Sequence, residues 1–452
     1  MVTPARRIAF EILQRVEAEG AYSGELLHAK LSDPRARIKR EDAALATELT
    51  LGVLRWQRLL DFFIERQTGK PVASLDLEVL LALRLGFYQL RFLSRVPASA
   101  AVNESVELVK AARKRSAASL VNAVLRKAPR EPIEKLLPEA LPPETRLGIL
   151  HSHPDWLVAR WLACFGESRT VALLEADNRA PRLACAVHQP VQRDAIEMDL
   201  RHGGMDVESG AWLRNSLLVR GGNPTATESF RRGKLSIQDE ASQMVAHLLD
   251  VRAGDSVLDL CAAPGGKTVI LARAAGPQSQ LVAADVHFHR LQAMSDTLSR
   301  LGITSVQQVA LDATTPLPFG RPFTRIIVDA PCSGTGTLAR NPEIRWRLQP
   351  PDLADLHRRQ VALLQNALGQ LASGGRLVYS TCSLEPEENE RVVDDALRNF
   401  SGLRCVSASA ALQSHLREGA DVARLFSPDG MFRTFPPEHG TDGFFAAAIQ
   451  HE

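Results

Sequence analysis

Residues 256–268 read Ser-Val-Leu-Asp-Leu-Cys-Ala-Ala-Pro-Gly-Gly-Lys-Thr. The largely apolar run 256–261 is typical of a buried strand, the small residues that follow predict a turn, and the run 265–275 predicts a helix. A phosphate-binding loop would need Gly-x-x-x-x-Gly-Lys-Thr, but Cys261 stands where its first glycine belongs. The dinucleotide fingerprint Gly-x-Gly-x-x-Gly is not matched either. The stretch therefore predicts a ligand loop of an α/β fold that does not cradle a triphosphate.

The rest of the C-terminal half continues this alternation of strand-like and helical runs. Alternating strands and helices indicate a parallel, doubly wound sheet. The sequence thus predicts a Rossmann-like α/β domain over 236–452, with a late antiparallel hairpin formed by 430–436 and 443–450.

The N-terminal half is organised differently. Apolar residues recur at helical spacing through 5–130, which predicts an all-α domain over 1–130. Proline density then rises, so 131–150 is expected to be a linker. Residues 151–235 mix a helical piece with short strand-like runs and predict a small α+β subdomain.

Charge is distributed unevenly between these parts. Residues 1–130 carry 22 Lys and Arg against 14 Asp and Glu, a net charge of +8, whereas the remainder carries 32 against 38, a net charge of −6. Basic clusters lie at 35–40, 110–115 and 126–130. This asymmetry favours a polyanionic partner for the N-terminal domain, with an ordinary solvated basic surface as the alternative.

Acidic residues lie at the ends of the predicted parallel strands. Asp285 ends the second strand, 26 residues after Asp259 in the first, and Asp312 and Asp329 follow the third and fourth strands. Ligands of a doubly wound sheet bind beyond these ends, where a carboxylate suits a ribose diol. A ring of acids repels a triphosphate but suits a ligand with ribose, adenine and positive charge. S-adenosylmethionine meets that description, and a nicotinamide or flavin cofactor is the alternative.

Two cysteines follow the fourth and fifth predicted strands. Cys332 lies in Pro-Cys-Ser-Gly, and Cys382 lies in Ser-Thr-Cys-Ser. Methyltransferase-type sheets usually have the strand order 3-2-1-4-5, which makes these two strands neighbours. Both cysteines then lie on the rim that carries the loop 261–267. A cysteine is most often a small buried hydrophobe, but two of six on one rim favour a chemical role.

A thiol beside a methyl donor suits methylation of cytosine at carbon 5. That carbon becomes nucleophilic only after a thiolate adds to carbon 6, and the adduct is resolved by loss of the carbon 5 proton and of the thiolate. Asp329 is placed to hold the amino group and the N3 edge of the base. Lys267 is placed to stabilise the adduct and to lower the pKa of a cysteine. These residues alone leave open which of Cys332 and Cys382 attacks.

Three motifs, at 256–268, 328–337 and 380–390, resemble those of the RNA 5-methylcytosine methyltransferases of the Sun/Fmu kind, the NOP/NOL/Sun family. The resemblance covers 236–452. Residues 1–130 resemble the NusB-like RNA-binding domain that is fused in front of one bacterial branch of this family. That branch methylates cytosine 967 of 16S rRNA, and the resemblance implies this activity.

The resemblance also implies a role for each matching residue. Cys382 is expected to attack carbon 6 and Cys332 to assist product release, although DNA cytosine methyltransferases use the Pro-Cys cysteine as nucleophile. Lys267 and Asp329 are expected to face the cytosine, and 151–235 to resemble a small RNA-recognition fold. The implied S-adenosylmethionine site consists of Cys261, Ala262, Ala263, Pro264, Gly265, Gly266, Lys267, Asp285, Asp312 and Asp329.

The expected protein is a cytoplasmic monomer that acts on RNA, and on neither DNA nor membranes. The sequence has no signal peptide, no membrane-spanning apolar run and no Cys-x-x-Cys pair, and His287 and His289 lack a third metal ligand. Transfer RNA is the alternative substrate. An RNA-binding factor with an idle catalytic domain is the alternative from another class, and the intact Cys332, Cys382 and Lys267 argue against it.

Overall fold

The structure is a computed structural model of the 452-residue chain, and it describes every residue except 1, 34, 36, 37, 130 and 452. The chain divides into two compact units. Unit 1 comprises Met1–Ala180 and Leu338–Leu348, and unit 2 comprises Pro181–Thr337 and Gln349–Glu452. None of the described helices is long and apolar enough to cross a membrane.

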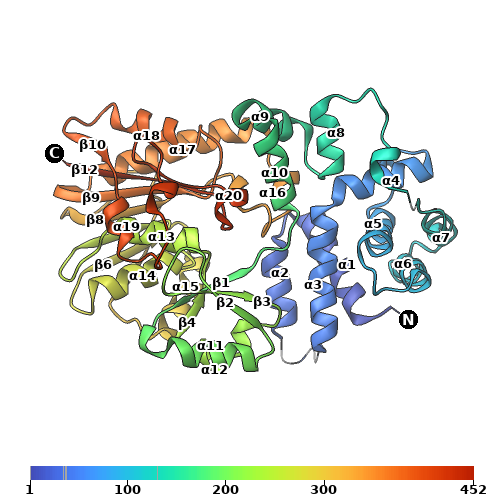
Figure 1. Cartoon of the computed structure of the whole chain (residues 1–452), viewed down its shortest axis with the longest axis horizontal. Coiled ribbons are helices and arrows are strands. Elements are labelled where there is room, and N and C mark those ends of the chain that lie inside the picture. Colours follow the sequence, from blue (N-terminus) through green and yellow to red (C-terminus); the bar gives the residue numbers. More distant parts are fainter. Residues whose placement is uncertain (1, 34, 36–37, 130, 452) are drawn as a thin grey trace. The chain divides into compact units, whose positions relative to one another are not determined.

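Unit 1 begins with a series of amphipathic helices (Figure 1). Pro4 opens the first helix, where its missing N–H is not needed. Leu13, Phe63 and Phe87 are fully buried in the core that the helices share. The all-α N-terminal fold is therefore confirmed. The helices are α1 (Pro4–Glu19), α2 (Ser23–Leu31), α3 (Arg40–Arg55), α4 (Gln57–Thr68), α5 (Leu77–Phe92), α6 (Ala98–Ala111) and α7 (Ala118–Arg126).

The helical part continues beyond the predicted linker. Helices α8 (Pro143–Leu150), α9 (Asp155–Phe165) and α10 (Glu167–Asp177) all belong to unit 1. The end of the predicted linker is thus helical, and the first strand starts only at Leu183. Unit 1 continues to Ala180, beyond the predicted boundaries at 130 and 150. Residue 130 itself is outside the described residues.

One segment of unit 1 comes from far along the chain. Leu338–Leu348, which contains α16 (Ile344–Arg347), packs with the N-terminal helices. Its Arg345 has no exposed surface and donates hydrogen bonds to the carbonyl oxygen of Ser152 (3.1 Å), the carbonyl oxygen of Asp177 (3.2 Å) and Asn178 Oδ1 (2.9 Å). Burial of a guanidinium is tolerated because these acceptors replace water.

Unit 2 begins with a small antiparallel sheet of strand order β2-β3-β1-β4. Cys185, Ile196, Leu217 and Leu235 are buried in its own core. These strands are the β part of the predicted α+β subdomain. The elements are β1 (Leu183–Val187), α11 (Arg193–His202), β2 (Asp206–Ser209), β3 (Ser216–Arg220), α12 (Glu228–Arg231) and β4 (Leu235–Ile237).

The second sheet of unit 2 has the order β10-β12-β9-β8-β5-β6-β7, with β11 paired to β12. Strands β7-β6-β5-β8-β9 are parallel and give the predicted 3-2-1-4-5 order, and β11 and β12 form the predicted hairpin. The Rossmann-like fold is confirmed. The strands are β5 (Val257–Leu260), β6 (Leu281–Asp285), β7 (Val306–Ala310), β8 (Phe323–Asp329), β9 (Leu371–Thr381), β10 (Leu403–Val406), β11 (Phe432–Thr434) and β12 (Phe444–His451).

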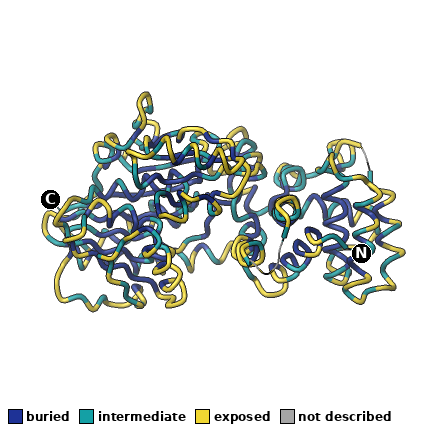
Figure 2. Tube along the Cα trace, turned by 90° about the horizontal axis from the view of Figure 1, so that it is seen from below, coloured by how far each residue is buried: buried dark blue, intermediate teal, exposed yellow. Residues whose placement is uncertain are grey.

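Helices cover both faces of this sheet. Val257 packs into the core on one face and the next residue, Leu258, packs into the core on the other, as a pleated strand requires. Figure 2 shows these strands as the buried interior of the unit. One face carries α13 (Glu240–Leu248), α14 (Gly266–Ala275), α15 (Phe288–Arg300) and α19 (Ser409–Gln413), and the other carries α17 (Pro350–Leu368) and α18 (Glu390–Leu397).

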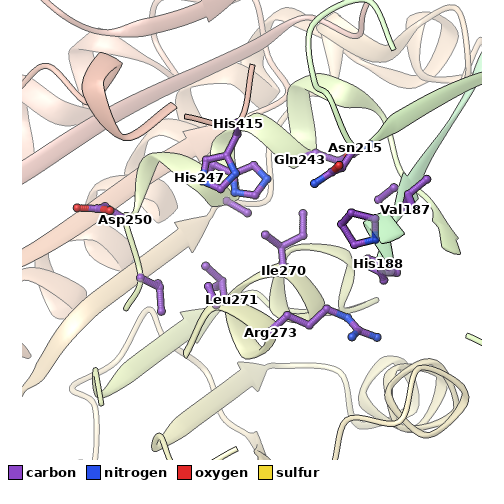
Figure 3. Close-up of a pocket in the computed structure, with 15 residues that line it drawn as sticks. Val187, His188, Asn215, Gln243, His247, Asp250, Ile270, Leu271, Arg273 and His415 are labelled. Atoms are coloured by element: carbon purple, nitrogen blue, oxygen red, sulfur yellow. The ribbon is translucent and has the colours of Figure 1, made fainter. Parts of the chain in front are cut away.

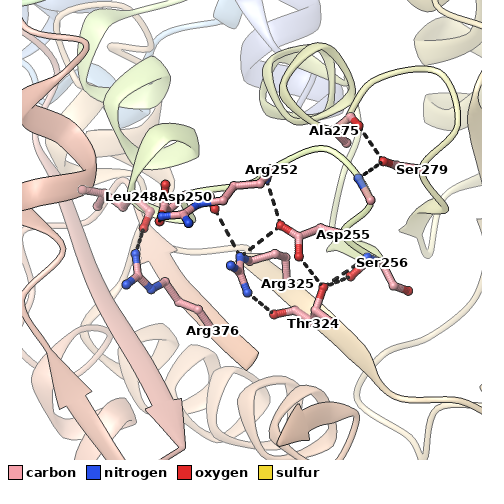
Figure 4. A network of polar contacts seen from close by, with 11 residues as sticks. Leu248, Asp250, Arg252, Asp255, Ser256, Ala275, Ser279, Thr324, Arg325 and Arg376 are labelled. Atoms are coloured by element: carbon pink, nitrogen blue, oxygen red, sulfur yellow. Dashed lines mark hydrogen bonds and ion pairs between the residues drawn. The ribbon is translucent and has the colours of Figure 1, made fainter. Parts of the chain in front are cut away.

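A polar network closes the amino-terminal end of the parallel strands (Figure 4). Arg325 lies 3.4 Å from Asp255, and Asp255 accepts a hydrogen bond from Thr324 Oγ1 at 2.8 Å. Arg376 donates to the carbonyl oxygen of Leu248. The loops that carry the predicted site residues directly follow the parallel strands, so they lie at the opposite, carboxyl end of the sheet.

Candidate active site

The loop 261–265 joins β5 to α14 through two residues in the left-handed region. Cys261 has φ of 62° and Gly265 has φ of 99°. A Cβ on Gly265 would lie 2.8 Å from Met294 Cγ, so the loop needs glycine for both its backbone angle and its packing. Burial, together with the charges of Asp285 and other nearby acids, raises the pKa of Cys261 well above its ordinary value. Cys261 is therefore a neutral thiol in the wall of the site.

Asp285 ties the end of β6 to this loop. Its carboxylate accepts the backbone N–H of Ala263 at 3.2 Å and that of His287 at 2.9 Å. Arg290 lies 3.5 Å from the same carboxylate and donates to the carbonyl oxygen of Ala263 at 2.7 Å. The structure thus brings together the loop and the second-strand acid that were both predicted to bind a cofactor.

Asp259 lies below the loop, in the middle of the sheet. It has no exposed surface, accepts a 2.6 Å hydrogen bond from Thr268 Oγ1, and has one carboxylate oxygen without a partner among the described residues. Burial, opposed by the Thr268 hydrogen bond and assisted by the negative charges of Asp329 and Asp285, raises its pKa to about 7. The surroundings of Asp259 therefore favour the protonated, neutral form of its carboxyl group.

Replacement of Asp259 by Asn is expected to remove a pH dependence of stability. The folded chain keeps a proton on Asp259 up to about pH 7, whereas the unfolded chain releases it near the ordinary value of 3.8. Stability of the natural chain therefore falls as pH rises through that window. The free energy of unfolding of Asp259→Asn, relative to that of the natural chain, should therefore increase by on the order of 4 kcal/mol between pH 4 and pH 8. Urea unfolding of both chains at the two pH values measures it, and a pH-independent difference would contradict it.

Lys267 and Asp329 form an ion pair at the carboxyl end of the sheet. Lys267 Nζ lies 2.7 Å from Asp329 Oδ2 and donates to Ser242 Oγ at 2.9 Å. The other Asp329 oxygen accepts from Ser380 Oγ at 2.8 Å. The ammonium also lies 5.1 Å from the ring centroid of Phe444, within range of a cation–π contact. These contacts hold a fixed cation and a fixed carboxylate side by side.

The two predicted cysteines are adjacent. Cys332 Sγ lies 3.3 Å from Cys382 Sγ, and both residues are partly buried. The hydrogen bond to Cys382 and burial, with the charge of Glu388 adding to them, raise the pKa of Cys332 well above its ordinary value. The expectation that a nearby cation lowers the pKa of a cysteine is thus wrong for Cys332. A neutral Cys332 thiol beside Cys382 is the state that the site favours.

A close backbone approach holds the Cys332 loop against Cys382, the residue that directly follows β9. Gly336 donates to the carbonyl oxygen of Cys382 at 2.9 Å and accepts from Gly443 N–H at 2.7 Å. A Cβ on Gly336 would lie 2.1 Å from the carbonyl oxygen of Gly443. Glycine is therefore required there, because no side chain fits between the two backbones.

Asp312 differs from the other predicted acids. It is exposed, and its carboxylate accepts hydrogen bonds from Thr314 N (2.9 Å) and Thr314 Oγ1 (2.7 Å) within its own turn. Those bonds lower its pKa. Asp312 lies after the edge strand β7, next to Leu311, whose backbone N–H donates to the carbonyl oxygen of Asp285 at 3.2 Å.

Sequence reasoning missed several residues that complete the site. Ser242 and Phe444 contact Lys267, and Arg290 contacts the loop. Arg290 could have been found from its position one turn into the helix after Asp285, whereas Ser242 and Phe444 lie far from any motif. Glu388 lies inside the motif 380–390, where a charged residue predicts an exposed side chain and gives no signal of its contacts.

The predicted basic clusters of unit 1 are partly engaged with neighbouring acids. Lys114 lies 2.9 Å from Asp76, and Lys110 lies 2.8 Å from Glu107. Arg37 and Arg130 lie outside the described residues. Phosphate contacts by these clusters therefore stay a prediction.

A separate cavity of about 300 Å³ lies between the small sheet and helices α13 and α14 (Figure 3). It contains the stacked imidazoles of His247 and His415, whose ring centroids are 3.7 Å apart, and the side chain of Arg273. None of the predicted site residues lines it. The predicted site residues of unit 2 thus lie at the strand ends and not in this cavity.

Two parts of the chain match models of known families. Residues 246–450 match the family described as 16S rRNA methyltransferase RsmB/F, and residues 3–130 match the NusB family. The whole chain is similar to the "Probable ribosomal RNA small subunit methyltransferase B" of Synechocystis sp., with 35% identity over 99% of each chain.

Two solved structures are similar in fold. The methyltransferase homolog protein from Pyrococcus horikoshii is 28% identical, with a TM-score of 0.57 over 69% of this chain and 100% of that chain. NSun6 from Pyrococcus horikoshii with SFG is 20% identical, with a TM-score of 0.57 over 67% of this chain and 99% of that chain.

Proposed function

The chain belongs to the RsmB/F family of 16S rRNA methyltransferases, and we propose from this that it methylates carbon 5 of one cytosine in 16S rRNA, at the position-967 class of site. The observation that carries the proposal is the pair of sulfur atoms 3.3 Å apart, on cysteines that follow the neighbouring strands β8 and β9, together with the Lys267–Asp329 ion pair at the end of β8. A nucleophilic sulfur, a cation and a carboxylate suit activation of cytosine by addition to carbon 6, and a second thiol suits the later release of the product.

The proposed cofactor is S-adenosylmethionine, which supplies an electrophilic methyl group when bound. The residues present fit its chemistry. Asp285 is a buried carboxylate beside the loop, and Val286 and Phe288 directly after it are 57% and 65% exposed, so apolar surface is available for a flat adenine. The similarity to NSun6 crystallised with SFG, an analogue of S-adenosylmethionine, supports the same assignment.

The nucleophilic role falls to Cys382. Its thiol loses a proton, the sulfur adds to carbon 6 of the cytosine, and carbon 5 becomes nucleophilic toward the methyl group. The ion pair then serves the base. Asp329 accepts from the exocyclic amino group, and Lys267 stabilises the negative charge that develops on the ring. Both side chains are already held in place by Ser380 and Ser242, so little reorganisation is needed.

Cys332 has its role in release of the product. After methylation the carbon 5 proton is removed and the bond between Cys382 Sγ and carbon 6 breaks, which restores the aromatic ring. A neutral Cys332 thiol 3.3 Å away donates a hydrogen bond to the departing sulfur and so stabilises the leaving thiolate. The raised pKa of Cys332 supports this role, because a thiol donates and a thiolate does not.

The NusB-like part of unit 1 is proposed to hold the RNA around the target. A cytosine inside a helix cannot reach the strand-end site, so the target lies in a loop or is flipped out. Contacts between the basic N-terminal residues and phosphates would make binding weaken steeply as salt is raised.

The test is methyl transfer in vitro. The purified full chain is incubated with methyl-labelled S-adenosylmethionine and with unmodified 16S rRNA or unmodified tRNA. We expect label in 5-methylcytidine of 16S rRNA, at a single cytosine that bisulfite sequencing identifies. Label in tRNA alone would overturn the substrate, and label in neither RNA, with intact RNA binding, would favour the RNA-binding factor with an idle catalytic domain.

A further inference from the structure

We propose that Glu388 is the positioning residue that fixes the Cys332 thiol beside Cys382, and that product release depends on it. This inference rests on the proposed function. Glu388 has no exposed surface and lies in the turn before α18, inside the motif 380–390 but six residues beyond its cysteine. A buried carboxylate is costly unless several donors satisfy it.

The donors that satisfy Glu388 come from both cysteine loops. Ser333, directly after Cys332, donates its backbone N–H to Glu388 Oε1 at 2.8 Å and its hydroxyl to Glu388 Oε2. Ser383, directly after Cys382, donates its hydroxyl to Oε2 at 2.5 Å. The two hydroxyls lie 3.0 Å apart. One carboxylate thus binds the residue that follows each cysteine and joins the two loops, in addition to the backbone bond from Gly336 to Cys382.

A third element joins the same carboxylate. Gln360 of α17 donates to Glu388 Oε1 at 2.9 Å and to the carbonyl oxygen of Pro331, directly before Cys332, at 2.9 Å. Cys332 is therefore flanked on both sides by residues that depend on Glu388, either directly through Ser333 or through Gln360.

The position of Cys382 is also fixed by hydrogen bonds that do not involve the Glu388 side chain. Asn389 accepts from Thr381 Oγ1 at 2.5 Å and donates to the carbonyl oxygen of Ser383 at 3.0 Å, so it binds both neighbours of Cys382. Loss of the Glu388 carboxylate should accordingly displace Cys332 while leaving Cys382 in place. The first half of the reaction should proceed and the release step should fail.

Glu388→Gln is the decisive variant, because an amide nitrogen cannot accept the hydrogen bonds that an oxygen of Glu388 accepts. Glu387→Gln is the matched control, since that neighbouring carboxylate pairs with Arg391 at the surface. We expect multiple-turnover methylation by Glu388→Gln to fall by roughly 100-fold, the scale of an ångström-sized misplacement. A single round should still occur, and the protein–RNA adduct should accumulate on a denaturing gel. Loss of a residue that only stabilised the fold would lower the single round of methylation and the multiple-turnover rate together.

A second measurement is independent of methyl transfer. Phenylarsine oxide binds two adjacent thiols, forming two arsenic–sulfur bonds with loss of one water. The natural chain and Glu387→Gln should bind it through Cys332 and Cys382, and Cys332→Ala should not. Glu388→Gln should bind it at least about tenfold more weakly, because the distance between the sulfurs is no longer fixed. If that variant fails to fold, Ser333→Ala replaces it, since it removes one hydroxyl donor and keeps the backbone bond.

The two measurements separate failure of this inference from failure of the proposed function. Unchanged arsenical binding and unchanged turnover in Glu388→Gln would overturn the positioning role. If Glu388→Gln binds the arsenical more weakly but the natural chain methylates no RNA, the positioning role stands and the proposed function is overturned.

Discussion

Replacement of Cys382 by alanine is expected to abolish methyl transfer to RNA. The variant loses the sulfur that adds to carbon 6, and loss of a catalytic nucleophile costs on the order of 10⁴-fold to 10⁶-fold in rate. S-adenosylmethionine binding should be nearly unchanged, because the proposed cofactor residues 261–267, Asp285, Asp312 and Asp329 lie at the ends of other strands than β9. Labelled methyl transfer and calorimetric binding measure the two effects.

The control for this variant is Cys164→Ala. Cys164 is exposed and belongs to α9 of unit 1, so its loss should leave both the rate and cofactor binding unchanged. A Cys382→Ala chain that still turns over would remove Cys382 as nucleophile. A chain that loses cofactor binding as well would mean that the substitution disturbed the sheet and not only the chemistry.

Replacement of Cys332 by alanine is expected to trap the enzyme on its RNA. Cys382 keeps its position directly after β9, so the sulfur still adds to carbon 6 and methylation still takes place. Release of Cys382 then lacks the thiol that donates to the departing sulfur. A slowly migrating protein–RNA band should therefore accumulate on a denaturing gel with 16S rRNA and S-adenosylmethionine. Its amount should approach one RNA per active chain.

The comparison of the two variants decides the order of the cysteines. A band with Cys332→Ala and none with Cys382→Ala assigns the nucleophile to Cys382. The reverse pattern would mean that Cys332 attacks, as the Pro-Cys cysteine does in DNA cytosine methyltransferases. The double variant Cys332→Ala/Cys382→Ala should form no band, which separates a covalent adduct from tight binding that survives the gel.

Local sequence was sufficient for the order of strands and helices in 236–452, for the helical character of the N-terminal part and for the residues of the three motifs. The strand SVLDL and the glycine-rich turn after it have strong local preferences, since apolar runs favour buried strands and small residues favour turns. The alternation of these runs predicted the parallel sheet, and three motifs predicted the loop 261–267 and both cysteines. Asp312 was predicted on the same strand-end argument; one of its carboxylate oxygens is bound within its own turn, and its role in cofactor binding stays a prediction.

Only the tertiary structure decided how these groups meet. The 3.3 Å between Cys332 and Cys382 depends on the pairing of β8 with β9, and the contacts of Ser242 and Phe444 with Lys267 join residues far apart in sequence. Glu388 and Arg345 are ordinary charged residues in the sequence, where a charge predicts exposure. Both are fully buried, because donors or acceptors from distant segments replace their water. Sequence determines which groups the chain carries, whereas burial and hydrogen bonding between distant segments determine which of them act together.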